Sequence, residues 1–437
     1  MAKNKPVLKI FEDRSVLYDS KGNSSEFIEG KLSDEAKERL KLVRKKLESG
    51  FLEDAIKEAK KPDAIIDGLS DKHVQTIEKL VVSVTSEVGR AVVGLAVLQL
   101  TIKAISPAQS IRLHKGSNAA KFSWVEGIPM RVLDKNFITP VLRKHKLLRL
   151  NADGFMMTRS LAENYPYSQL YKAAIRGAKE EWIKIVDWVE NKEMDAKKAL
   201  LQLLAFLNNR SEGFLKNVEE ATKSLNSFLE LNPSLEEVLG LIEEFVDESA
   251  YSARIFEISI HALFQIFEDA KCLEGYLKPI SQMRSANKKH GNIGDIEITA
   301  SKDGLDILEA WDAKYGKTYL RDELEEINEK LIHHPQCRVA GFITDSHPNL
   351  KREITDRMEE LGIIHEITLG IFKFSDWVKE QIARFELDYD EAGKNWITAL
   401  TESICQQRRE RCPIDEPTGE WVKSIAAKLS GKRNTER

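Results

Sequence analysis

Three charged residues in the C-terminal half of the chain have the types and spacing that chemistry on a phosphate needs. Asp295 follows Gly294, and Asp312 and Lys314 form an Asp-x-Lys triplet further along. Proteins usually bind Mg²⁺ through one or two carboxylate ligands, which leaves the other coordination positions of the ion for water and phosphate. An ammonium group beside them would orient or help to deprotonate the attacking water and offset the charge on the phosphate oxygens. This set predicts metal-dependent cleavage of a phosphodiester.

A hairpin is needed to bring these side chains together. Two stretches around them alternate between polar and apolar residues, and an Asp-Gly pair in the polar break between them is a strong hairpin signal. Successive side chains of a strand point to opposite faces, so Asp295 and Glu297 share one face of the first strand. Asp312 and Lys314 likewise share a face of the second. The alternative is a charged, solvated hairpin, since Asp-x-Lys triplets are common in a chain that is 31% charged.

The segments after this hairpin predict the rest of an α/β core. A helical stretch precedes the strand-like Val339–Ile343, and another helix precedes a strand predicted at Ile363–Phe372. The predicted order is therefore strand, strand, helix, strand, helix, strand, which belongs to the mixed α/β fold class.

The residues of this hairpin, together with the predicted order of elements, resemble the PD-(D/E)xK nuclease superfamily. Gly294-Asp295 stands in place of Pro-Asp, and Asp312 and Lys314 form the D-x-K arm. The resemblance implies that Asp295 and Asp312 hold Mg²⁺ and that Lys314 acts on the water. Restriction-type members often carry a metal-assisting glutamate on the helix before the first strand, which here implies Glu257. The alternative is a glutamate on the solvent side of that helix.

A second informative region is basic. Asn136–His145 is predicted to be a short helix, and Leu147–Leu150 with Phe155–Thr158 is predicted to be a hairpin. A helix followed by such a wing resembles a winged helix-turn-helix, which contacts DNA through both elements. The basic side chains that would contact phosphate are Arg143, Lys144, Lys146, Arg149 and Arg159. The alternative is a basic, solvent-facing connector.

The loop before the nuclease-like hairpin is also polar and basic. Its Asn287 and His290 are candidate contacts to DNA, and an ordinary surface histidine is the alternative for His290. Lys317 and Arg321, just past the Asp-x-Lys triplet, are further candidates.

The succession of short motifs gives a narrower resemblance. Phe-Ser-Trp ending at Trp124, Arg-Val-Leu ending at Leu133, and an Arg-x-x-x-x-Asn-x-Pro element starting at Arg159 all precede the hairpin. In this order the chain is similar to SacI-type restriction endonucleases. The resemblance implies a type II enzyme that acts as a homodimer on a short site in double-stranded DNA, with a cognate DNA methyltransferase as a separate partner.

Length and composition set outer limits. A chain of 437 residues with 42% hydrophobic content predicts two or three domains, and a net charge of -4 restricts any DNA surface to a local patch. Four widely spaced cysteines predict reduced thiols. The N-terminus lacks an apolar signal core, and the apolar run Ala91–Ile105 is too short and interrupted to span a bilayer. These features predict a soluble, cytoplasmic protein.

Several other enzyme classes are disfavoured, because the chain has no P-loop, dinucleotide fingerprint, H-E-x-x-H or G-x-S-x-G motif. The predicted order of domains is a helical region at 1–110, a winged-helix-like DNA-recognition element at 111–178, a helical scaffold at 179–249 and a PD-(D/E)xK-like nuclease domain at 250–437. The predicted function is type II restriction. Two alternatives stay open: a non-catalytic DNA-binding regulator, and a repair or mobile-element nuclease with the same core.

Overall fold

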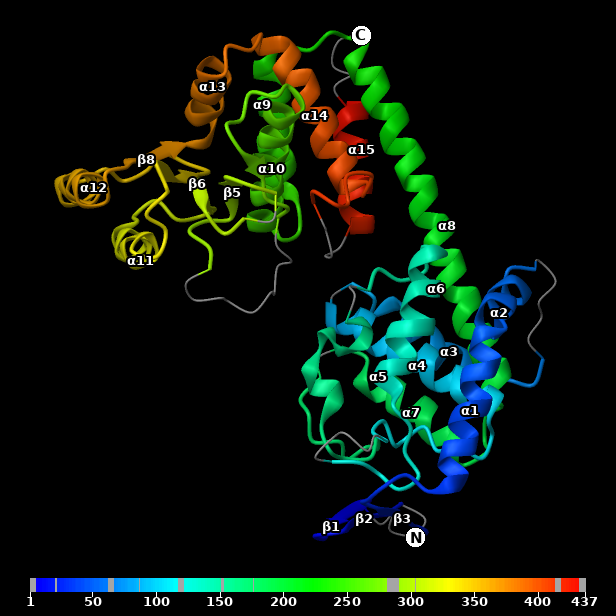
Figure 1. Cartoon of the computed structure of the whole chain (residues 1–437). Helices are drawn as coiled ribbons and strands as arrows, with labels where there is room; N and C mark the ends of the chain where they lie inside the picture. The colour runs from blue at the N-terminus through cyan, green and yellow to red at the C-terminus, as the bar shows by residue number, and fades with distance from the viewer. Residues whose placement is uncertain are drawn as a thin grey trace. The chain divides into compact units, whose positions relative to one another are not determined.

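The structure is a computed structural model of the whole chain (Figure 1). It describes residues 5–19, 22–61, 67–85, 87–116, 122–150, 153–175, 177–280, 291–302, 304–412 and 418–431. The chain divides into two compact units, Met1–Gly213 and Phe214–Arg437. The boundary falls inside one helix, α8 (Ala196–Leu229), and each unit has its own hydrophobic core.

The N-terminal unit opens with a three-stranded antiparallel sheet. Its strands, in spatial order, are β1 (Val7–Ile10), β2 (Arg14–Tyr18) and β3 (Ser24–Ile28). Leu17 and Phe27 project from one side of this sheet and pack with Leu113 and Trp124. The sheet is thereby attached to the loop region that follows the main helices.

Helices make up most of this unit. They are α1 (Asp34–Glu48), α2 (Phe51–Ala59), α3 (Asp71–Val82), α4 (Glu87–Ile105), α7 (Lys179–Glu190) and the first part of α8. Ser33 caps α1 by accepting a hydrogen bond from Ala36 N at 3.0 Å, and Ser70 caps α3 by accepting one from His73 N at 3.3 Å. Such caps satisfy amide groups that the first turn of a helix leaves without partners.

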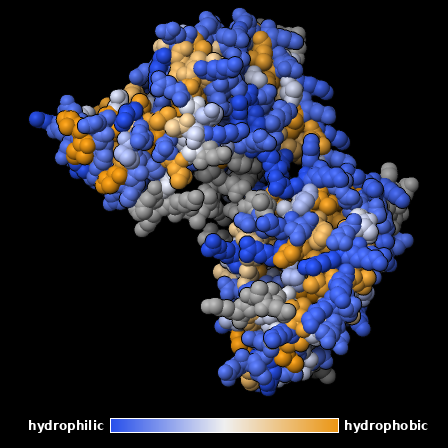
Figure 2. All heavy atoms as spheres, in the orientation of Figure 1, coloured by the Kyte–Doolittle hydropathy of each residue, from blue (hydrophilic) through white to orange (hydrophobic). Residues whose placement is uncertain are grey.

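Helix α4 is the buried centre of the N-terminal unit. Its segment Val88–Ile105 is longer than the predicted run Ala91–Ile105, and among the described residues it is the one helix long and apolar enough to cross a membrane. The prediction that this apolar run is too short to span a bilayer is therefore wrong. However, 78% of the segment is buried inside the protein, as in the core helix of a soluble protein. Figure 2 shows the largely hydrophilic surface that surrounds such cores.

The predicted helix in the basic region is present in broken form. The elements here are α5 (Met130–Leu133), the π-helical turn η1 (Asp134–Ile138), α6 (Thr139–Lys144) and the 3₁₀ turns η2 (Gly154–Met157) and η3 (Arg159–Ala162). The predicted helix Asn136–His145 corresponds to η1 and α6.

The predicted wing is wrong. Leu147–Leu150 is not a strand, and the second predicted arm forms η2, so the described part of this region contains no β-hairpin. Leu147, Leu148 and Leu150 are all buried, whereas a half-buried strand would alternate. The carboxylate of Asp134 also accepts a hydrogen bond from Phe155 N at 2.9 Å, which ties η2 to η1. The described residues of this segment form no β-hairpin, and its three leucines pack in the core of the unit.

The C-terminal unit is built on a five-stranded mixed sheet. Its strands, in spatial order, are β4 (Tyr276–Leu277), β5 (Ile296–Thr299), β6 (Ile307–Lys314), β7 (Val339–Thr344) and β8 (Thr368–Lys373). The first three strands are antiparallel, and β6, β7 and β8 are parallel. The predicted α/β class and element order are confirmed. The last strand begins at Thr368, not at Ile363, because Ile363 and Ile364 still belong to a helix.

Helices cover both faces of this sheet (Figure 1). The helices that the structure describes in this unit after α8 are α9 (Leu235–Glu248), α10 (Ser252–Asp269), α11 (Arg321–Leu331), α12 (Arg352–His365), α13 (Phe374–Arg384), α14 (Tyr389–Ile404) and α15 (Thr418–Gly431). Ile296, Ile298 and Trp311 pack in the core that contains α10, α13 and α14. Ala310 and Phe342 pack on the opposite side with α11 and α12.

Candidate active site

The β5–β6 hairpin brings the two predicted aspartates together. Ile296 pairs with Trp311 in an antiparallel register, so Asp295 lies next to Asp312 where the two strands meet. The Oδ2 atom of Asp295 accepts a hydrogen bond from Ala313 N at 3.1 Å. The convergence predicted from the two-residue period of the strands is therefore observed.

Lys314 completes the predicted triplet. Its Nζ atom lies 2.8 Å from Oδ2 of Asp312, on the face that the two residues share, and both side chains are mostly buried. Burial opposes the charge on this lysine, but the carboxylates of Asp312 and Asp295 outweigh burial and raise the pKa of Lys314. The lysine therefore stands as a cation beside the two carboxylates, where it can stabilise negative charge.

Glu257 on α10 belongs to the same electrostatic cluster. Burial raises the pKa of Glu257, the guanidinium of Arg254 opposes that shift, and the charge of Asp312 adds to it. Arg254 Nη1 lies 2.6 Å from Oε2 of Glu257, and only 22% of the glutamate side chain is exposed. Glu257 thus faces inward near Asp312 and does not lie on the solvent side of its helix.

The carboxylates of this cluster suit a hard divalent cation. Burial raises the pKa of Asp295 well above its ordinary value, and the nearby charges of Asp312 and Glu257 raise it further. Crowded carboxylates gain from a bound proton or a cation. Within the described residues, no group of three or more His, Cys, Asp and Glu side chains could hold a metal ion by itself. Two carboxylates are a number that Mg²⁺ uses in many protein sites, where water or phosphate supplies its other ligands.

Gly294 is a site residue whose role the sequence did not reveal. A Cβ atom at this position would lie 2.6 Å from the carbonyl oxygen of Trp311, so no other residue type fits without backbone movement. The close approach brings the chain before Asp295 against the start of the Asp-x-Lys triplet. The available signal was the glycine that stands where the superfamily pattern has proline.

A second set of contacts holds β6 in place. Arg384 on α13 forms two hydrogen bonds to the carboxylate of Glu309, at 2.8 and 2.9 Å, and Trp311 Nε1 donates to the same carboxylate at 2.7 Å. A bidentate pair of this kind fixes both distance and orientation. Neither Glu309 nor Arg384 was singled out in the sequence, because nothing local indicates that they meet.

The described residues that are predicted to contact DNA lie on several different elements of the chain. Arg143, Lys144 and Lys146 are exposed at the end of α6, and Lys144 Nζ lies 2.7 Å from Glu53 Oε1. Arg149 is half-buried and Arg159 is exposed at the start of η3. Asn287 and His290 lie outside the described residues. Lys317 pairs with Glu323, and Arg321 pairs with Glu325.

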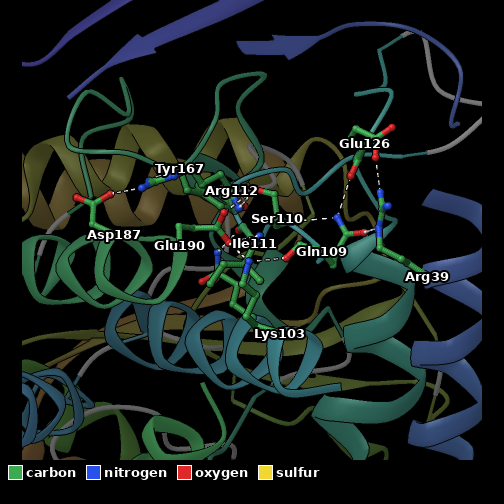
Figure 3. A network of polar contacts seen from close by, with 11 residues as sticks. Arg39, Lys103, Gln109, Ser110, Ile111, Arg112, Glu126, Tyr167, Asp187 and Glu190 are labelled. Carbon is green, nitrogen blue, oxygen red and sulfur yellow. Dashed lines mark hydrogen bonds and ion pairs between the residues drawn. The ribbon is translucent and has the colours of Figure 1, made fainter. Parts of the chain in front are cut away.

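A polar network in the N-terminal unit is structural (Figure 3). Glu190 on α7 accepts hydrogen bonds from Lys103 Nζ at 2.9 Å, Ser110 Oγ at 3.1 Å and Ile111 N at 3.0 Å. Arg112 lies 2.6 Å from Asp187. Each acid here faces a cation, so the network fixes the loop after α4 against α7 and offers no surplus charge to a ligand.

A scan against protein-family models finds no match to this chain, and a search of the curated proteins finds no relative. Its function is therefore inferred from the chemistry of the site.

Proposed function

We propose that this protein is a Mg²⁺-dependent endonuclease of the PD-(D/E)xK type that hydrolyses phosphodiester bonds in double-stranded DNA. The observation that supports the proposal is the pairing of Asp295 with Asp312 across a hairpin, with Lys314 2.8 Å from Asp312. Two carboxylates and one ammonium at a common point are what metal-assisted hydrolysis of a phosphate diester requires.

Each residue has a role that follows from its surroundings. Asp295 and Asp312 would hold Mg²⁺, and the ion when bound would supply Lewis-acid stabilisation of the phosphate oxygens. Lys314 would orient the attacking water and offset the charge that develops on the phosphate. Glu257, held by Arg254, would add negative charge behind Asp312 and strengthen the attraction for the cation.

The finer proposal is a type II restriction enzyme that cuts at a specific short site. It would act in the cytoplasm as a homodimer, because a two-fold protein matches a palindromic duplex, and a DNA methyltransferase would protect the host sites. The succession of motifs from Trp124 to Pro166 supports this over a general nuclease.

The alternatives differ in what supports them. A non-catalytic DNA-binding regulator rested on the predicted wing, and the described residues of that region form no β-hairpin. A repair or mobile-element nuclease would use the same carboxylates and lysine, and it differs from a restriction enzyme only in substrate preference.

One assay separates the three. Purified full-length protein is incubated with unmethylated phage DNA in Mg²⁺ or in EDTA. Discrete fragments that depend on Mg²⁺ are expected. A smear that depends on Mg²⁺ would favour the repair-type nuclease, and intact DNA in a retarded band would overturn the enzymatic proposal in favour of the regulator.

A further inference from the structure

We propose that Glu297 and Lys278 form a positioning pair that fixes Asp295 opposite Asp312. This inference rests on the proposed metal site and adds two residues that act through Asp295. Glu297 lies on the same side of β5 as Asp295, so strand periodicity alone makes it a candidate second ligand. Its contacts give it a different role.

Both carboxylate oxygens of Glu297 are already engaged. Oε1 accepts hydrogen bonds from Ile293 N at 2.6 Å and Gly294 N at 3.3 Å, and Oε2 accepts one from Lys278 Nζ at 2.6 Å. The side chain is 2% exposed. Turning it toward a metal would leave the buried amide of Ile293 without this acceptor and break the ion pair with Lys278, which is unfavourable.

Lys278 connects this carboxylate to the neighbouring strand. It follows β4 directly, its backbone N donates to the carbonyl of Glu297 at 2.9 Å, and its Nζ also reaches Asn292 Oδ1 at 3.4 Å. The lysine therefore links β4, β5 and the segment that enters the site.

The two amides that Glu297 accepts from belong to the residues immediately before Asp295. Holding them keeps Gly294 against the carbonyl of Trp311, where only a glycine fits, and leaves the Asp295 carboxylate in reach of Ala313 N. The distance between the two proposed ligands is thus set by a carboxylate that is not itself a ligand. Partners of this kind usually change metal affinity by 10- to 100-fold when removed.

The test is Mn²⁺ binding by titration calorimetry on full-length variants, which needs no turnover. Lys278→Met is expected to weaken Mn²⁺ binding by about tenfold, and Glu297→Gln by about the same, since glutamine offers a single acceptor oxygen. Lys278→Arg keeps the positive charge and the donor, and it is expected to restore most of the affinity. Lys302→Met, an exposed lysine in the turn of the same hairpin, is the matched control and should bind as the wild type does.

The sign of the Lys278→Met effect is decisive. If Glu297 were a metal ligand, removing the neighbouring cation would free its carboxylate and tighten Mn²⁺ binding. Tighter or unchanged binding in a variant whose unfolding midpoint stays near that of the Lys302→Met control would overturn the inference. If that midpoint drops, Lys278→Arg decides, because failure of the arginine to restore affinity also overturns it.

Failure of the proposed function gives a different result. In that case the wild type itself does not bind Mn²⁺, or Asp312→Asn binds it equally well. Wild-type binding that is lost in Asp312→Asn but unaffected by Lys278→Met would leave the metal site in place and refute the positioning pair alone.

Discussion

Acidic side chains meet opposite kinds of partner in two regions of this protein, the contact between α7 and the loop after α4 in the N-terminal unit and the β5–β6 hairpin in the C-terminal unit. In the N-terminal unit, Glu190 accepts hydrogen bonds from Lys103 and two further donors, and Asp187 faces Arg112 at 2.6 Å. In the C-terminal unit, Asp295 is pressed toward Asp312 and Glu257, and the pKa of Asp295 is raised well above its ordinary value by burial and by those two acids.

This difference separates carboxylates that hold the fold from those of the proposed metal site. An acid whose oxygens are filled by donors holds the chain in one shape and gains little from an added ion. Acids that lie close to one another favour a proton or a divalent cation between them. The comparison can be tested by changing one acid in each unit and measuring activity and stability separately.

The largest effect is expected from Asp312→Asn. Losing a ligand removes the bound ion and its stabilisation of the transition state, so cleavage of phage DNA should fall by about a thousandfold or more, equivalent to ~4 kcal/mol. Binding of DNA in EDTA, followed by gel shift, should change little. Cleavage that survives in this variant would contradict the assignment of the site.

The matched control in the N-terminal unit is Asp187→Asn. It breaks a mostly buried ion pair with Arg112, and the expected result is a loss of about 3 kcal/mol in the free energy of unfolding with kcat per folded molecule unchanged. Urea titration and steady-state cleavage measure the two quantities.

The next largest effect on cleavage is expected from Lys314→Gln. Because the lysine is cationic and lies beside Asp312, its loss should lower kcat by about a hundredfold while Mn²⁺ affinity stays equal or increases. Metal titration and single-turnover cleavage distinguish this pattern from that of Asp312→Asn. Weaker Mn²⁺ binding would show that Lys314 supports the carboxylates and does not act on the substrate.

A pH effect is expected from the buried acid of the N-terminal unit. Burial raises the pKa of Asp134 from 3.8 to about 6, against the hydrogen bonds from Phe155 N and Thr139. The folded state therefore binds more protons than the unfolded state, so this stabilisation is present below pH 3.8 and is lost as pH rises through about 6. The loss amounts to up to ~3 kcal/mol.

Asp134→Asn tests this expectation. Its amide can accept from Phe155 N and donate to Thr139 Oγ1, so the difference in unfolding free energy between variant and wild type should grow in favour of the variant across that pH window. Metal binding in the C-terminal unit should not change. A difference that is flat with pH would contradict the raised pKa.

A smaller effect is expected from Gly294→Ala. The added methyl meets the Trp311 carbonyl oxygen, so the variant should be destabilised by about 2 kcal/mol and should bind Mn²⁺ more weakly. Gly240→Ala in α9, where nothing lies within 4 Å of the new Cβ, should instead stabilise the protein by about 0.5–1 kcal/mol. Equal free energies of unfolding in the two variants would contradict the close approach of Gly294 to the Trp311 carbonyl oxygen.

The smallest effect concerns the basic cluster. If Arg143 and Lys144 contact phosphate, replacing each with glutamine should reduce the dependence of log affinity on log salt by about 0.9 per lost contact, with unfolding free energy nearly unchanged. Fluorescence anisotropy on a duplex at several salt concentrations measures it. An unchanged slope would make these residues a solvent-facing connector.

Local patterns were sufficient to predict the hairpin. Polar and apolar residues alternate around Asp295 and Asp312, and a strand has only two faces, so pairing of the strands brings these acids together whatever surrounds them. The prediction of the wing was wrong because its residues have no such alternation. Leu147, Leu148 and Leu150 have no clear period, and only the tertiary structure shows that all three are buried in the core and form no strand.

The sequence by itself determined which side chains share a face of the β5–β6 hairpin, because residue spacing along a strand fixes the face that each one occupies. Only the tertiary structure decided what each acid does there. Asp295 and Glu297 look equivalent in the chain, yet Lys278 and two backbone amides occupy the oxygens of Glu297, and Asp295 is left facing another carboxylate. The role of a buried charge is set by the partners that reach it, and those partners come from segments distant in the sequence.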